Sequence, residues 1–148
     1  MPFTEANFEN AILEIFRDLL GYEYLYGPDV VRDFAEPLCV EILEDALVRI
    51  NPSLPRAAID EAIARIRNIE SGSLARKNAR FTDMLQNGVA VNYFDGSEQR
   101  AGLVRLVDYD LPMRNRFTVA NQWTVEERSV RRADIVVFVN GLPLVVVE

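Results

Sequence analysis

Two carboxylates mark the ends of the last apolar stretch of this 148-residue chain. Residues 133–148 contain two apolar runs separated by Asn140-Gly141, a turn signal that predicts a β-hairpin. Asp134 begins the first run, Glu148 ends the second, and no other residue of the stretch ionises. Because each run is apolar on both faces, we expect this hairpin to be central in a sheet and covered on both sides.

The length of the loop decides whether the two carboxylates meet. A three-residue loop from Asn140 to Leu142 places Asp134 opposite Glu148, whereas a two-residue loop puts them on opposite faces. Opposed like charges cost energy in a sheet, and a divalent cation between them reverses the sign of that interaction. Oxygen-only ligands suit Mg²⁺ or Mn²⁺. The alternative interpretation is that Asp134 is a solvated strand-start residue and that Glu148 simply ends a strand.

A longer string around this pair resembles a known nuclease motif. Residues 131–148 read RRADIVVFVNGLPLVVVE, which is similar to the nuclease motif of the restriction (R) subunit of type I restriction–modification enzymes, a form of the PD-(D/E)xK signature. Ala133 stands where that family usually has proline. The family's lysine, expected two residues after Glu148, lies beyond the printed sequence, so we expect a chain truncated inside the E-x-K motif and inactive as an isolated fragment.

The resemblance runs in order along nearly the whole chain. It includes residues 21–27, 47–55, 78–88, 106–112 and 115–125. It implies a single domain over 1–148, the incomplete N-terminal nuclease domain of an R subunit. The implied fold is α/β with a restriction-endonuclease-like core: a central mixed sheet with the active hairpin at its C-terminal end, an N-terminal helix, and a helical insertion over residues 28–88.

The resemblance also implies a function. The domain would hydrolyse phosphodiester bonds of double-stranded foreign DNA with Mg²⁺, coupled in the full protein to ATP-driven translocation. ATP would bind a downstream motor, since this chain has no Gly-Lys-Ser/Thr phosphate loop. The expected partners are the DNA and the methyltransferase (M) and specificity (S) subunits of the complex. The expected location is the cytoplasm of a bacterium or archaeon, with no membrane contact.

Residue by residue, the resemblance assigns Asp134 and Glu148 as catalytic residues and metal ligands. An N-terminal helix with a glutamate near Glu9 packs beside the active hairpin in that family, so Glu9 is the candidate for a third metal ligand, with Glu5 as runner-up. The other interpretation of Glu9 is a boundary residue whose stem is packed and whose head is in water.

Four more polar residues are candidates near the site. Arg131 and Arg132 lie beside Asp134 in the sequence and could contact backbone phosphates, which positions DNA without reading its sequence. Gln122 could be a polar neighbour of the site, although it could equally bond backbone at a bulge. Asp108 could likewise be a polar neighbour of the site, or it could cap a turn.

Local patterns predict the remaining elements. Thr4 can cap a helix to about Leu20, with Phe8, Ile12, Ile15 and Leu19 toward the core. Residues 28–90 look helical, with helices ending at Ile50, running over 55–69, and starting at Ser73. Strands are expected at 89–94, 101–108 and 115–125.

Composition excludes several classes of site. The chain has no histidine, which removes Ser-His and Cys-His catalysis and histidine metal sites. The single cysteine, Cys39, excludes an internal disulfide and is expected to pack in the core. The net charge of −7 argues against a broad basic face. Two other functional classes stay open: a non-catalytic docking or DNA-binding module of a restriction complex, and a different PD-(D/E)xK nuclease.

Overall fold

The computed structural model describes residues 2, 4–69 and 72–148 and divides into two compact units. The first, the sheet unit, is built from Met1–Val40 and Arg116–Glu148. The second, the helical unit, is Glu41–Asn115. The sheet unit contains both predicted catalytic carboxylates, so its architecture positions the site.

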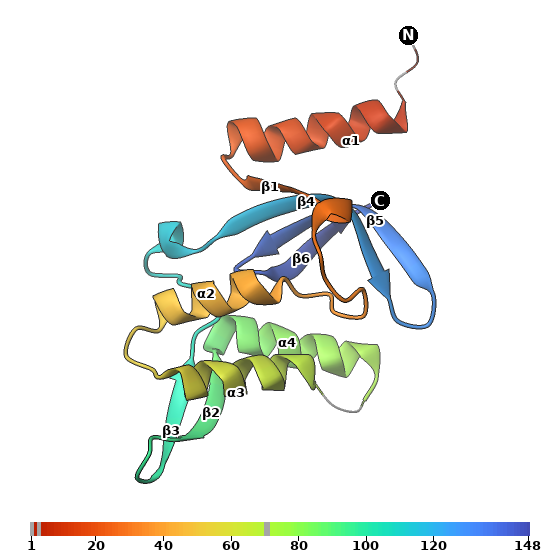
Figure 1. The fold of residues 1–148 in the computed structure, drawn as a ribbon. Coiled ribbons are helices and arrows are strands. Elements are labelled where there is room, and N and C mark those ends of the chain that lie inside the picture. The colour runs from red at the N-terminus through yellow and green to blue at the C-terminus, as the bar shows by residue number, and fades with distance from the viewer. Residues whose placement is uncertain (1, 3, 70–71) are drawn as a thin grey trace. The chain divides into compact units, whose positions relative to one another are not determined.

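In the described part of the chain the sheet unit holds a four-stranded sheet in the order β1-β4-β5-β6 (Figure 1). The strands are β1 (Glu23–Tyr26), β4 (Phe117–Glu126), β5 (Val130–Val139) and β6 (Leu142–Val147). β1 and β4 are parallel and the other pairs are antiparallel, so the sheet is mixed, as predicted. The prediction of a hairpin covered on both sides is wrong for its second strand. β6 is an edge strand, and Leu144, Val145 and Val146 are 40%, 49% and 57% exposed.

The hairpin turn is the two-residue Asn140-Gly141 loop, because Val139 pairs directly with Leu142. Both loop residues have positive φ, 51° and 79°, which is the backbone of a type I′ turn and explains the Asn-Gly sequence. Asn140 is fully buried, and its side-chain Oδ1 accepts the N–H of Arg116 at 2.7 Å. The turn is therefore anchored to the start of β4 as well as being locally favourable.

A β-bulge then corrects the register of the hairpin. Phe138 pairs with Pro143 but Val137 pairs with Val145, so Leu144 is an extra residue in β6. Beyond the bulge Ile135 pairs with Val147. One step further, the same register places residue 134 opposite residue 148, the arrangement that sequence reasoning had attached to a three-residue loop.

Helix α1 (Glu5–Glu14) lies along one face of this sheet (Figure 1) and continues as a single π-helical turn over Ile15–Leu19. Thr4 caps it as predicted, accepting the N–H of Asn7 at 3.3 Å. Its inner face packs on Val119, Ile135 and Val137 and is formed by Leu13, Ile12 and Phe16.

Part of the predicted core face of α1 is wrong. Phe8, Ile15 and Leu19 are 55%, 49% and 78% exposed. Two apolar lines run along this helix, and the sheet takes the one that begins at Glu9 and continues through Leu13 and Phe16. Glu9 therefore lies in line with the buried face of α1.

The segment between β1 and the next helix is not helical, contrary to prediction. It forms a 3₁₀ turn at Gly27–Asp29 and then an irregular strap to Cys39. Pro28 and Pro37 limit helical hydrogen bonding in this segment. Cys39 is buried as predicted, and burial raises the pKa of its thiol to about 11.

The helical unit contains α2 (Val40–Ile50, whose first residue belongs to the sheet unit), α3 (Arg56–Arg67), α4 (Leu74–Asn87) and a hairpin of β2 (Val89–Phe94) and β3 (Gln99–Val104). The buried stripe of α3 includes Ile59, Ile63 and Ile66, and Ser73 caps α4 by accepting the N–H of Arg76, both as predicted. β3 ends before the predicted Asp108. That carboxylate instead caps a turn, accepting the N–H groups of Asp110 and Leu111 at 3.2 and 3.0 Å. No helix in the described residues is both long and apolar enough to cross a bilayer.

Candidate functional site

A cavity of about 160 Å³ in the sheet unit lies between the first turns of α1 and the point where the end of β6 meets the middle of β5. It is lined by Glu5, Phe8, Glu9, Ile12, Asp134, Ile135, Val147 and Glu148. Four of these residues are acidic, two from the helix and two from the hairpin. The structure therefore gathers at one place all four carboxylates that sequence reasoning had selected from the two ends of the chain.

The hairpin contributes its carboxylates through register. Asp134 is half-buried and Glu148 is exposed, and between them the pair Ile135 and Val147 forms an apolar part of the wall. Charges beside apolar walls are screened less than charges in open water, so two carboxylates here repel each other more than they would in water. An arrangement of this kind favours a bound cation.

Glu9 is fixed by amide donors from β4. Its Oε1 accepts the side-chain N–H of Asn121 at 3.0 Å, and its two oxygens accept Nε2 of Gln122 at 3.1 and 3.2 Å. These bonds hold the carboxylate in one orientation beside the cavity. The backbone-bonding interpretation of Gln122 is not what the structure has, because its amide binds Glu9.

An irregularity in β4 makes this possible. Consecutive side chains of a regular strand point to opposite faces, yet Asn121 and Gln122 both reach Glu9. Gln122 has φ of 52°, and the ladder between β4 and β5 is interrupted where Gln122 lies opposite Asp134. The next residue, Trp123, packs on Phe138 with ring centroids 5.0 Å apart. A single left-handed residue thus turns two amides toward the helix.

The strap after β1 supports this irregularity from behind. A Cβ on Gly27 would lie 2.6 Å from the carbonyl oxygen of Asn121 and closer still to that of Gln122, so only glycine fits there. Arg32 places its guanidinium 3.7 Å above the ring of Trp123 and donates to the carbonyl of Thr124. Both contacts hold β4 immediately beside Gln122.

Asn121 and Tyr24 are site residues that sequence reasoning missed. The hydroxyl of Tyr24 donates to Oδ1 of Asn121 at 2.8 Å, which fixes the amide so that its N–H groups face Glu9. Partial burial raises the pKa of Tyr24 and keeps it protonated as a donor. The sequence signal that could have found Asn121 is the adjacent pair of amide residues, Asn121-Gln122, within a predicted strand.

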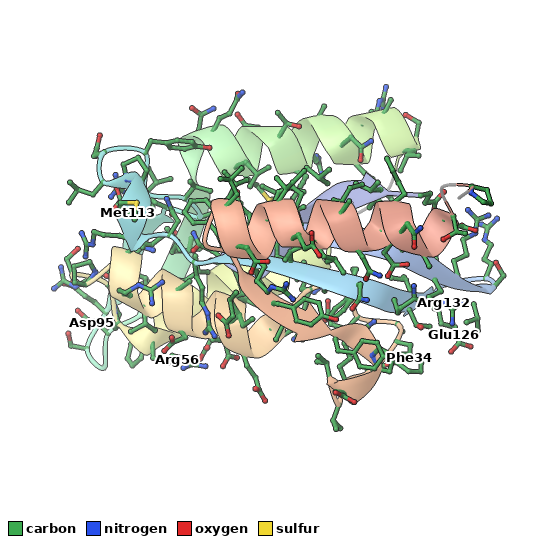
Figure 2. The ribbon with its side chains drawn as sticks, turned by 90° about the horizontal axis from the view of Figure 1, so that it is seen from above. Phe34, Arg56, Asp95, Met113, Glu126 and Arg132 are labelled. Carbon is green, nitrogen blue, oxygen red and sulfur yellow. The ribbon has the colours of Figure 1, made fainter. Side chains whose placement is uncertain are left out.

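Arg131 and Arg132 do not line the acidic cavity. They are exposed at the start of β5, opposite Val125 and Thr124. Arg131 instead lines a separate cavity of about 260 Å³ at the β4–β5 turn. Figure 2 shows Arg132 and Glu126 toward the outer end of these strands. Phosphate contact by these arginines stays a prediction.

The donor set suits a hard cation. Within residues 2, 4–69 and 72–148 no group of three or more Asp, Glu, Cys or His side chains forms a ready metal cage. Mg²⁺ commonly uses only one or two carboxylates and keeps several waters, so Asp134 and Glu148 are a sufficient protein contribution. Glu9, which already accepts hydrogen bonds from two amides, stays a predicted ligand.

Comparisons with known proteins give a consistent result. The family described as type I restriction enzyme R protein N terminus matches residues 2–148. The chain is 38% identical, over 98% of its length, to the type I restriction enzyme HindI endonuclease subunit of Haemophilus influenzae. It is 30% identical, over 95% of its length, to the putative type I restriction enzyme MjaIXP endonuclease subunit of Methanocaldococcus jannaschii. The chain spans only 15% and 14% of the lengths of these two relatives.

Proposed function

Because the chain belongs to the family of type I restriction enzyme R protein N-terminal regions, we propose that it is the endonuclease domain of such a subunit. Its reaction is Mg²⁺-dependent hydrolysis of phosphodiester bonds in double-stranded DNA. The observation that supports this most strongly is the bulged hairpin, which sets Asp134 against Glu148 in one cavity with Glu9. An uncompensated pair of this kind is costly in a sheet unless a cation is held there.

Each residue has a role in this proposal. Asp134 and Glu148 would hold Mg²⁺, and the ion would supply an acidified water and a positive charge that stabilises the phosphate. Glu9 stays oriented by Asn121 and Gln122 and adds a carboxylate on the opposite wall. Asp134 is half-buried beside the apolar part of the wall, which strengthens the interaction of its carboxylate with a cation.

The rest of the system belongs to the same proposal. ATP-driven translocation of DNA takes place in a motor outside this chain, and methyltransferase (M) and specificity (S) subunits select the DNA. The supporting observation is that the chain spans a small fraction of relatives named as type I restriction endonuclease subunits. No ATP site is assigned to this chain, which has no Gly-Lys-Ser/Thr phosphate loop.

The test is cleavage of supercoiled plasmid by the gene product that contains this chain, assembled with its M and S subunits and supplied with Mg²⁺ and ATP. Asp134→Asn keeps the size of the side chain and removes its charge. We expect it to lower cleavage by more than the roughly 10–100-fold that outer-shell changes at metal sites cost. ATP hydrolysis, which the proposal assigns to the motor, should continue.

The matched control is Asp110→Asn, an exposed aspartate of the helical unit. It makes the same chemical change at a residue that does not line the cavity and should cleave like the parent. Undiminished cleavage by Asp134→Asn would remove the catalytic assignment and leave a docking role for the domain.

A further inference from the structure

A second charged feature lies in the helical unit and has no role in the hydrolysis proposed above. Residues 65–80 carry five cations and one carboxylate, a net charge of +4, within a chain of net charge −7. All five cations are on α3 or α4. Four of them form what we call the basic face: Arg65, Arg76, Lys77 and Arg80. A local concentration of one sign in an acidic protein points to an anionic partner.

The basic face is exposed. None of the described side chains of α4 is buried, and the first two turns of the helix are open to solvent. Arg76 and Arg80 are one helical turn apart and Lys77 lies three residues before Arg80, so the three form one contiguous patch. Arg76 and Arg80 are about 6 Å apart along the helix axis. Each nucleotide of a DNA strand rises about 3.4 Å, so this distance is slightly less than two nucleotide steps.

The placement of these cations opposes local helix stability. Arg76 and Lys77 lie in the first turns of α4, where the helix dipole favours acidic residues, and the first turn of α4 has none. The dipole and the side chains therefore add to the same positive potential. The helix dipole and the cationic side chains would both attract an anion outside the helix. An acidic residue in the first turn would cancel this positive potential, but α4 has none there.

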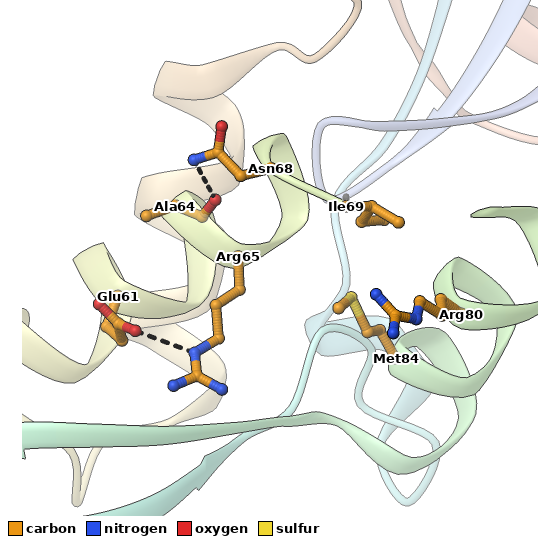
Figure 3. A pocket seen from close by; sticks show the side chains of 7 residues that line it. All are labelled: Glu61, Ala64, Arg65, Asn68, Ile69, Arg80 and Met84. Carbon is orange, nitrogen blue, oxygen red and sulfur yellow. Dashed lines mark hydrogen bonds and ion pairs between the residues drawn. The ribbon is translucent and has the colours of Figure 1, made fainter. Parts of the chain in front are cut away.

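A cavity of about 340 Å³ between α3 and α4 gives this potential a shape. Figure 3 shows Arg65 and Arg80 on its two sides, with Met84 and Ile69 between them. Glu61 holds Arg65 through Nε at 2.9 Å, and in Figure 3 the two terminal nitrogens of that guanidinium lie beyond the contact. Such an arrangement can receive a phosphate from outside while its own carboxylate fixes the arginine.

We propose that the basic face binds the phosphate backbone of the DNA duplex, as a docking surface separate from the acidic cavity. This rests on the proposed function, which makes duplex DNA the substrate. A protein partner fits less well. The cores of protein–protein interfaces are built on buried aromatic or apolar residues and are depleted in charged ones. Here the cations dominate and the cavity has no aromatic lining.

The test is equilibrium binding of the 148-residue chain to a fluorescein-labelled 20-base-pair duplex, measured by anisotropy over a series of KCl concentrations without divalent ions. The variant is Arg76→Gln/Lys77→Gln/Arg80→Gln. Since each phosphate contact contributes about 0.9 to the slope of log affinity against log salt, we expect the slope to become shallower by about 2 to 3. Affinity at low salt should fall at least tenfold.

The matched control is Arg17→Gln/Arg56→Gln/Arg100→Gln, which removes the same formal charge from three exposed arginines outside the basic face. It should change the slope much less than the basic-face variant. Arg76→Lys/Arg80→Lys keeps the charge and should bind like the parent. Far-UV circular dichroism of each variant establishes that α4 is retained.

Three results would overturn the proposal: no duplex binding by the parent chain, an unchanged slope in the basic-face variant, or an equal loss in the control. If the parent chain prefers an acidic polypeptide such as polyglutamate over the duplex, the surface takes a protein partner and the proposal is also wrong. Failure here is distinguishable from failure of the nuclease assignment, which is read from cleavage.

Discussion

Gln122 adopts a left-handed backbone conformation in the middle of β4, with φ of 52°. Non-glycine residues reach this region at a cost of roughly 1–2 kcal/mol. The cost is offset locally, because the conformation lets Gln122 and Asn121 both bond Glu9. Strain of this kind, placed beside a cavity with four carboxylates, is what a pre-positioned site requires.

At position 122, glycine should therefore be tolerated better than the β-branched residues that strands usually favour. Valine, normally favourable in β-structure, should destabilise the chain by about 1–2 kcal/mol more than glycine, because a β-branched residue resists positive φ. Urea unfolding of Gln122→Val and Gln122→Gly measures the difference. Equal or greater stability of the valine variant would mean that position 122 is an ordinary extended residue.

Asp108 offers a test by pH. It is 1% exposed, and its pKa is held below the ordinary 3.8 by the N–H of Leu111 and then by the charges of Arg105 and Arg114. A depressed folded-state pKa contributes stability above the unfolded value, and that stability is lost as pH falls through the folded pKa. The parent should lose free energy of unfolding as the pH falls below about 4.

In Asp108→Asn that part of the acid dependence should disappear, and the variant should be less stable than the parent at pH 7. Urea unfolding at pH 7, 4 and 3 compares the two proteins. A parallel loss of stability in both across this range would assign the acid sensitivity to other carboxylates.

At the scale of elements, the bulge at Leu144 is the device that assembles the site. The Asn-Gly loop alone would put Asp134 and Glu148 on opposite faces, and one extra residue in β6 restores them to the same register. The sequence signals the turn clearly, but it has no comparable signal for a bulge. For this reason sequence reasoning left the loop length open and linked the observed register to a three-residue loop only.

Deleting Leu144 should shift Glu148 by one residue relative to Asp134 while leaving the turn intact. We expect loss of Mg²⁺ binding comparable to that in Asp134→Asn, measured by calorimetry, with the sheet retained by circular dichroism. Leu144→Ala keeps the residue count and should bind as the parent does. Equal binding by the deletion variant would show that the bulge does not set the site.

Elements with strong local signals were predicted well. Thr4 and Ser73 cap helices, the isoleucines of α3 are buried, and the Asn-Gly turn forms. The core face of α1 was predicted only in part. Its sequence has two apolar stripes, and packing on the sheet determines which of them is buried. The contacts of Tyr24 and Asn121 join segments about a hundred residues apart, and no local pattern encodes such a pairing.

On the scale of the whole molecule, charge is divided unevenly between the two units. The sheet unit carries twelve acidic and six basic residues, and the helical unit carries eleven and ten. An acidic cleavage site repels a polyanion such as DNA unless cations compensate. We propose that Mg²⁺ compensates this repulsion at the cavity and that the cations of the basic face compensate it on the helical unit.

We propose above all that Asp134 and Glu148 form a cation site. The measurement that tests it most directly is calorimetric titration of the 148-residue chain with Mn²⁺ and Mg²⁺, beside Asp134→Asn and the exposed control Asp45→Asn. We predict one saturable site in the parent and in the control, and its loss in Asp134→Asn. Equal binding by all three folded proteins, or no binding by the parent, would contradict the claim.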